Sequence, residues 1–348
     1  MFSENGKISI KQLQCLVISD FIVLYILLLP YFFMKNSACG IILKLLMSFL
    51  FGAVILYFCT LCAKKKVKND GENVLKILCI FLLMKTLFIN GFFINIINSA
   101  ENIYLSAGKN SVITICILAF FSFYLCVNGI ETIGRLAEIA AFFIIIVVMA
   151  AVLVSFFKCD IGEGGIAFCT DENFAIDTIK IILFLCGMEG IFFILPYVET
   201  NEKNIGKSLL FSFGIFSAAV IFIVFGAVCF FGEKLIITTH WQAAEFMKNM
   251  SAGFLHQRQN ILFTGVLLLG EAMYWAYSVF FSAEYMRKIF PKLKFKKSVV
   301  LASVAVFIFV FLSKEGFLYC SYTAIAFINI LSLAFSLLYF LKYGGIKP

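Results

Sequence analysis

The stretch IILFLCGMEGIFFILPY, residues 181–197, has the pattern of a membrane span that is broken at its centre. The motif Gly-Met-Glu-Gly at 187–190 interrupts an apolar run, and Pro196 closes it. Glycine in the middle of a helix weakens it, and non-helical backbone at membrane depth is tolerated only where it is buried in protein or lines a cavity. The pattern therefore predicts a protein-lined polar site in the middle of this span.

Glu189 places a carboxylate in that interruption. Ionisable side chains inside a membrane are costly and usually functional, so Glu189 is a candidate for binding a ligand or an ion. The alternative is a kinked span in which Glu189 hydrogen-bonds a neighbouring helix and serves packing alone.

The composition of the whole chain is that of a polytopic membrane protein. Of its 348 residues, 62% are hydrophobic and 14% are charged, whereas soluble domains are roughly 45–50% apolar and about 25% charged. The first apolar run, 12–33, is long enough to span a bilayer and is not followed by a small-residue cleavage site, so we expect it to remain as a span.

Hydropathy divides the chain, read as a single membrane domain over 1–348, into about ten transmembrane helices. Their expected limits are 12–33, 38–62, 75–98, 111–127, 135–157, 174–197, 208–231, 260–285, 298–313 and 318–341. With the N-terminus inside, 17 of the 28 Lys and Arg residues fall in inner segments and 7 in outer segments. This bias predicts that both termini are cytoplasmic, with the inner basic runs facing anionic membrane lipids.

Ten spans divide into two sets of five, and an odd number per set means that the second set enters the membrane inverted. We expect a first repeat over 8–157, an outer linker over 158–173 and a second repeat over 174–341. Leu-Pro-Tyr occurs near the end of both the first and the sixth span, at 29–31 and 195–197. The predicted fold is therefore an all-α inverted-repeat bundle.

The loops carry fewer signals. Cys159 and Cys169 lie in the outer linker and could form a disulfide, whereas the lone pair Cys59 and Cys62 has no second pair or histidine to complete a metal site. The outer segment 241–255 carries apolar residues at helical spacing, which predicts a short amphipathic helix over the outer mouth. No catalytic or nucleotide motif is present, so we expect neither an enzyme nor a cofactor, and nothing favours a nucleic-acid partner.

Four ionisable residues lie near the centres of their spans: Asp20, Lys85, Glu189 and Glu271. Spans 1, 3, 6 and 8 meet around the central site of an inverted-repeat transporter, so we expect these side chains in one site. An uncompensated charge at the bilayer centre costs roughly 2.5–3.5 kcal/mol, and we expect Lys85 to pair with Asp20.

Further residues join this candidate ligand or ion site. Tyr274 and Trp275 follow Glu271 on the same helical face, although packing against lipid is the alternative for both aromatic side chains. The remaining members of the predicted site are the neighbours of Glu189 in the broken span: Gly187, Met188 and Gly190.

Several segments, in order along the chain, resemble one known family. They are KISIKQLQCLVISDFIVLYILLLP at the N-terminus, NGIETIGRLAEIAAF at 128–142, the broken span with its Gly-Met-Glu, and WQAAEFMKNMSAGFLHQRQNILF at 241–263. Together they are similar to the GerAB-type spore germination proteins, the B subunits of nutrient germinant receptors. That family lies within the amino acid, polyamine and organocation transporter superfamily.

The resemblance implies a LeuT-like fold with broken helices 1 and 6, although the stretch 19–23 lacks the glycines that family members usually carry where the first helix unwinds. It also implies a place in the spore inner membrane, A and C receptor subunits as partners, and recognition of a small germinant such as an amino acid. Two alternatives remain: an amino acid or amine permease, coupled to protons or sodium, that acts alone, and a scaffold subunit with a vestigial pocket.

Overall fold

The computed structural model describes residues 6–33, 38–63, 71–105, 111–158, 163–185, 188–199, 205–239, 242–249, 259–312 and 322–344. Helices are the regular elements of these residues, with one isolated bridge between Ile8 and Val198. In chain order they are α1 (Ile10–Phe33), α2 (Ile41–Ala63), α3 (Glu72–Leu105), α4 (Ser111–Val127), α5 (Ile130–Lys158), η2 (Glu163–Phe168), α6 (Phe174–Leu185), η3 (Met188–Gly190), α7 (Ile191–Ile194), η4 (Leu195–Tyr197), α8 (Ile205–Thr238), α9 (Gln242–Asn249), α10 (Gln259–Ile289), α11 (Phe295–Leu312) and α12 (Tyr322–Tyr343).

The ten expected spans are confirmed, with the sixth built from α6, η3, α7 and η4. Within the described residues, seven helices are long and apolar enough to cross a membrane, and α4 is a shorter apolar helix. The break in the sixth span is present, but the break expected in the first span is not, because α1 is one continuous helix from Ile10 to Phe33. Without glycine at 19–23, the backbone of α1 has no residue that favours unwinding there.

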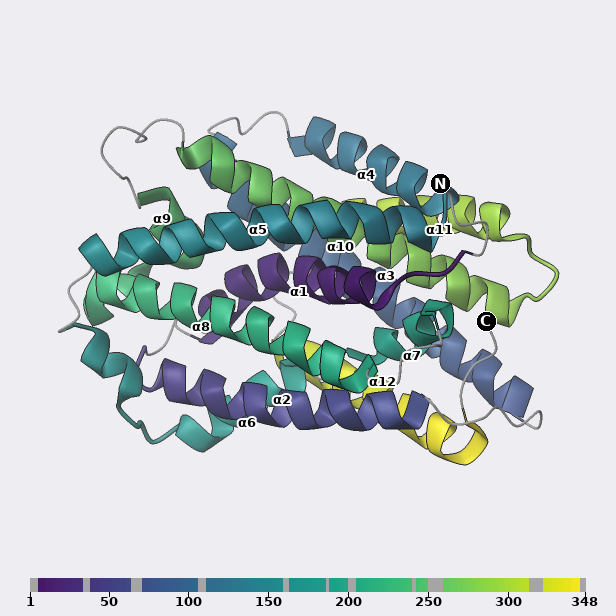
Figure 1. Cartoon of the computed structure of the whole chain (residues 1–348), viewed down its shortest axis with the longest axis horizontal. Helices are drawn as coiled ribbons and strands as arrows, with labels where there is room; N and C mark the ends of the chain where they lie inside the picture. The colour runs from purple at the N-terminus through teal and green to yellow at the C-terminus, as the bar shows by residue number, and fades with distance from the viewer. Residues whose placement is uncertain are drawn as a thin grey trace.

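The helices form an elongated bundle in which α1 is central (Figure 1). It packs against α5, α8 and α10, while α10 also packs along α3. The start of α1 and the end of α12 lie at the same end of the bundle, here called the terminal end, and α9 lies at the opposite end (Figure 1). This agrees with an even number of spans; the expected repeat limits stay a prediction.

The connection before α6 is fastened to the bundle near its α9 end. The buried Lys44 of α2 forms ion pairs with Asp171, at 2.8 Å, and with Asp177 in the first turn of α6, at 3.4 Å. Ser48 adds a hydrogen bond of 3.1 Å from its hydroxyl to the carbonyl of Thr178. We call these contacts the Lys44 clamp, since they join α2 to the start of the sixth span. Cys169 in this connection is an exposed free thiol, and Cys159 lies outside the described residues.

The short helix expected in the 241–255 segment is present as α9. Its described buried side chains, Gln242, Ala243 and Phe246, face the bundle, and the ring of Phe246 lies 5.9 Å from that of Phe230 in α8. The predicted apolar face, Trp241, Ala244, Met247, Met250 and Phe254, lies outside the described side chains.

Helices α3 and α11 approach closely at Gly91. A Cβ at this position would lie 3.2 Å from the backbone carbon and oxygen of Phe309. The side-chain amide of Asn95, one turn further along α3, donates a hydrogen bond of 2.7 Å to the carbonyl of Val310. Small residues allow such close packing of membrane helices, and a polar side chain can then bond across the interface.

We expect Gly91→Val to lower the free energy of unfolding by about 1–3 kcal/mol, because the added side chain must force α3 and α11 apart. The matched control is Gly214→Val in α8, where nothing lies within 4 Å of the added Cβ. Thermal unfolding in detergent gives the unfolding temperature of each purified variant. Equal unfolding temperatures for the two variants would contradict the close approach at Gly91.

Candidate functional site

The sixth span is helical at both ends and irregular between them. Helix α6 ends at Leu185, and the chain resumes as the short 3-10 turn η3, the single turn α7 and the second 3-10 turn η4. Pro196 lies in the first turn of η4, where its missing N–H is least costly. Gly187 lies outside the described residues, as does the side chain of Met188.

The end of α6 leaves carbonyl groups without partners in their own helix. The carbonyl of Phe184 accepts hydrogen bonds from the side-chain amide of Asn329 in α12, at 3.2 Å, and from the hydroxyl of Tyr25 in α1, at 3.4 Å. Asn329 and Tyr25 are both buried. Side chains from two other helices therefore satisfy backbone that the break exposes, as the apolar surroundings require.

Glu189 of η3 pairs with Lys85 of α3 inside the bundle. Oε1 of Glu189 accepts the hydrogen bond from Lys85 Nζ, which also donates one of 2.7 Å to Ser332 Oγ in α12. Lys85 is 8% exposed and Glu189 4%, so both charges are nearly removed from solvent. The pair joins three elements: α3, the centre of the broken span and α12.

The sequence predicts a pair between Lys85 and Asp20. The side chain of Asp20 lies outside the described residues, so that pair stays a prediction beside the observed one with Glu189. Lys85 extends from α3 toward the irregular backbone of η3, where Glu189 can approach it.

The ionisable residues lie at two depths along α10. A Cβ on Gly190 would lie 2.8 Å from Cζ of Phe281, so η3 lies beside this part of α10. At the same depth, the hydroxyls of Thr86, next to Lys85, and Ser282 are 3.3 Å apart. Glu271 precedes Phe281 by ten residues, which is about 15 Å along a helix at 1.5 Å per residue. Glu271 and Glu189 therefore do not form the single cluster that the sequence predicts.

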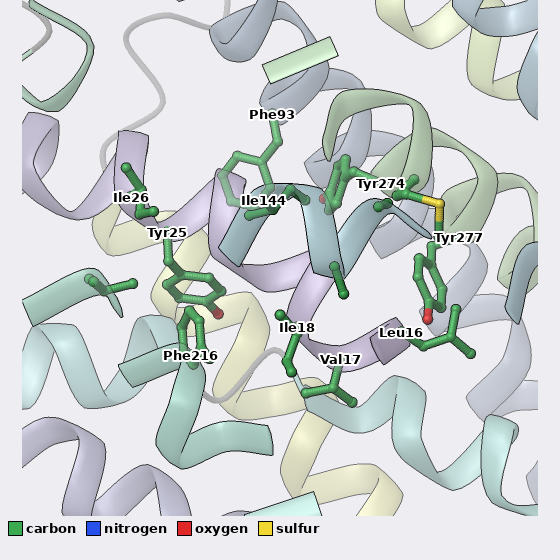
Figure 2. Packing of buried hydrophobic residues seen from close by; sticks show 14 of the residues in the cluster. Leu16, Val17, Ile18, Tyr25, Ile26, Phe93, Ile144, Phe216, Tyr274 and Tyr277 are labelled. Carbon is green, nitrogen blue, oxygen red and sulfur yellow. The ribbon is translucent and has the colours of Figure 1, made fainter. Parts of the chain in front are cut away.

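A layer of aromatic rings crosses the bundle from α10 to α8. Ring centroids are 6.2 Å apart for Tyr274 and Phe93, 5.8 Å for Phe93 and Phe184, and 5.4 Å for Phe184 and Tyr25. Tyr25 then meets Phe216 at 5.3 Å. Figure 2 shows the ring of Tyr25 against Phe216, and it also draws Phe93 and Tyr274. The layer includes Phe184 near the end of α6, so the last turn of α6 before the break is packed between aromatic rings of α1 and α3.

The predicted face of α10 points into the bundle rather than toward lipid. Glu271 is fully buried, and Trp275 and Tyr274 are 1% and 7% exposed. The hydroxyl of Ser278 on the same face bonds the carbonyl of Tyr274, at 2.9 Å. The structure thus places Glu271, Tyr274 and Trp275 inside the protein, at a different depth from the Lys85–Glu189 pair.

Sequence reasoning missed the polar row on α12. Asn329, Ser332 and Ser336 are buried and recur at the spacing of one helical face in an otherwise apolar span. That spacing could have identified the row, because polar side chains inside membrane helices bond across helices. It faces the broken span, since α12 packs against α6 and η3.

The site retains hydrogen-bonding capacity among the described residues. Oε2 of Glu189 and Oγ of Ser336 are buried and have no hydrogen-bond partner there. A buried carboxylate oxygen in a low-dielectric site is a strong acceptor for an ammonium, hydroxyl or amide donor. Among the described residues, the break of the sixth span therefore keeps a buried acceptor, Glu189 Oε2, and a buried hydroxyl, Ser336 Oγ, that are open to further hydrogen bonds.

Comparison with known proteins identifies both a family and a fold. A family model described as "Spore germination protein" matches residues 7–318. No curated protein sequence matches the chain significantly.

Among solved structures, MhsT in complex with L-phenylalanine is 12% identical with a TM-score of 0.72, over 97% of this chain and 88% of that one. Mhp1, a nucleobase-cation-symport-1 family transporter, in a closed conformation with bromovinylhydantoin bound, is 14% identical with a TM-score of 0.65, over 98% and 82%. The inward-facing conformation of Mhp1 is 14% identical with a TM-score of 0.56, over 94% and 76%. These similarities establish a LeuT-like transporter fold.

Lys85→Met and Glu189→Gln should each destabilise the protein by about 3–5 kcal/mol, because each leaves its partner charged and buried. The double variant should lose less than the sum of the two, since it buries no unpaired charge. Thermal unfolding in detergent gives the coupling energy of this double-mutant cycle. The control cycle uses Arg135→Met and Glu131→Gln, a pair at the helix surface, where the coupling should be below about 1 kcal/mol. Additive effects at Lys85 and Glu189 would contradict the buried pair.

Proposed function

The chain belongs to the spore germination protein family, and from this premise we propose that it is the B subunit of a nutrient germinant receptor. In this proposal it binds a small germinant, an amino acid, at the break of the sixth span, and binding triggers germination. The A and C subunits of the receptor are its proposed partners. Its proposed location is the spore inner membrane, with the terminal end of the bundle in the cytoplasm.

The observation that carries this proposal is the Lys85–Glu189 pair at the centre of the broken span. A buried ion pair opens at high cost unless each charge finds another partner. A zwitterionic amino acid offers a carboxylate to Lys85 and an ammonium to Glu189, so it can replace the internal pair without leaving a buried charge alone. Ser332 supplies a neutral hydrogen bond beside it.

The other predicted site residues take separate parts in this proposal. Met188 and Gly190 belong to the 3-10 turn that the ligand would approach, and Gly187, which precedes this turn in the sequence, is proposed to take part as well. Glu271, Tyr274 and Trp275 are too far along α10 to touch an amino acid held at Glu189, so we assign them to a second region at the depth of the aromatic layer and beyond it, toward the α9 end. Asp20 stays a candidate for the site around Lys85.

A permease acting alone is the second candidate, favoured by the transporter fold. It would carry an amino acid or amine across the membrane, coupled to protons or sodium. Uptake of a radiolabelled amino acid by vesicles that contain this chain without other subunits distinguishes it from the receptor. A scaffold with a vestigial pocket would show neither uptake nor stabilisation by any nutrient in a thermal-shift screen.

Spores carrying Glu189→Gln should respond to nutrient about tenfold more slowly or worse. Hydrogen bonds to charged groups contribute about 1.5–3 kcal/mol, and each 1.36 kcal/mol is a factor of ten. The measurement is the fall in optical density after nutrient addition, with Glu131→Gln as the control. Immunoblots establish that the variant protein is present in the spore membrane.

A normal nutrient response from abundant Glu189→Gln protein would contradict this proposal. If the variant does not accumulate, Lys85→Met/Glu189→Gln decides, because it leaves no unpaired charge in the bundle. That double variant should accumulate and still not respond, and a normal response from it would equally reject the role.

A further inference from the structure

The residues before α1 pair with the residues that end the sixth span. The backbone N–H of Ile8 donates to the carbonyl of Tyr197, at 2.8 Å, and the N–H of Glu199 donates to the carbonyl of Ile8, at 3.1 Å. These bonds form the parallel bridge between Ile8 and Val198, whose side chains are fully buried. Neither bond is needed to complete a helix. The bridge therefore joins the start of α1 directly to the second piece of the broken span.

The N-terminal side of the bridge is held firmly. Ser9 and Gln12 form a reciprocal capping box: the N–H of Ser9 bonds Gln12 Oε1 at 3.0 Å, and the N–H of Gln12 bonds Ser9 Oγ at 3.2 Å. A Cβ on Gly134 of α5 would lie 3.3 Å from both Ile8 Cγ2 and Gln12 Cβ. Ile8 is thus fixed to the cap of α1 and to α5, so opening of the bridge requires Val198 and η4 to move.

The two pieces of the sixth span are fastened by different forces. The Lys44 clamp holds the start of α6 through charges that include a nearly fully buried lysine, which resist separation. The second piece, α7 and η4, is held by the bridge, by the stacked rings of Phe192 and Phe340 at 4.2 Å, by the rings of Phe193 and Tyr285 at 4.8 Å, and by polar contacts of Tyr197 with Glu284 and Arg287. Because Ile8 is fixed to the cap of α1 and to α5, the second piece is the one that must move when the bridge opens.

We propose that the Ile8–Val198 bridge is a latch that holds α7 and η4 closed over the terminal end of the bundle. Opening the latch would uncover the cluster that Phe192 and Phe193 share with the buried thiols of Cys62 and Cys79. The latch stands on the contacts above, and only its trigger, germinant binding at the break, rests on the proposed function. Rearrangement of η3 around a ligand would pull on α7, which follows it directly in the chain.

The test measures the rate at which N-ethylmaleimide labels Cys79 in the purified full chain, without any germinant, by mass spectrometry of the labelled peptide. Ile8→Pro removes the N–H that bonds Tyr197, whereas Ile8→Val keeps it. Cys79 is fully buried, so its labelling reports opening. Ile8→Pro should raise the rate about three- to tenfold, as expected for loss of one hydrogen bond, and Ile8→Val should not.

Two cysteines of α4 serve as internal controls for the labelling of Cys79 in α3. The exposed Cys116 should label equally in every variant, and the buried Cys126 should stay unlabelled unless the whole protein unfolds. An unchanged rate at Cys79 in Ile8→Pro, with Cys126 still protected, would overturn the latch.

If Ile8→Pro also exposes Cys126, the double variant Ile8→Cys/Val198→Cys tests the latch instead. Oxidation should join the two residues and slow the labelling of Cys79 below the wild-type rate, and a reducing agent should restore it. Oxidised protein that labels at the wild-type rate would overturn the latch. Since no germinant is used, these results are independent of the response of Glu189→Gln spores.

Discussion

The structure depends on satisfying an interrupted backbone in apolar surroundings. A helix that stops inside a membrane exposes carbonyl and amide groups whose unpaired burial costs several kcal/mol. Here Asn329 and Tyr25 reach the carbonyl of Phe184 from α12 and α1. The break is consequently not a local defect of one span, since its stability requires the positions of at least two other helices.

Charge adds a second requirement at the same place. Lys85 and Glu189 are tolerable in the bundle only because they are paired, and a buried pair contributes more to specifying one arrangement than to net stability. The pair links α3 to η3, which directly precedes the piece that we propose to move, so a ligand that competes for either charge changes the contact between them. A binding event at η3 can in this way be transmitted to α7 and η4 through the chain itself.

The sequence allowed the ten spans, the break in the sixth span and the short helix α9 to be predicted, because each depends on local signals: hydropathy, Gly and Pro, and helical periodicity. It did not identify Glu189 as a partner of Lys85, because depth within a span does not reveal the register between helices. Glu271 and Glu189 each lie near the middle of their own span, yet α10 presents Phe281 to η3. The absence of glycine at 19–23 agrees with the continuous helix α1 better than the family pattern does. The helical spacing of the polar residues on α12 is a further local signal, from which the polar row could have been predicted.

The most direct test of a ligand site at the break is photo-crosslinking of the purified chain with photo-leucine, an amino acid that carries a diazirine. The account predicts that the label attaches to peptides around η3, Lys85 or Ser332, and that excess unmodified leucine prevents it. Labelling confined to the lipid-facing side of α4 or to the α9 end, or labelling that leucine does not displace, would contradict the account.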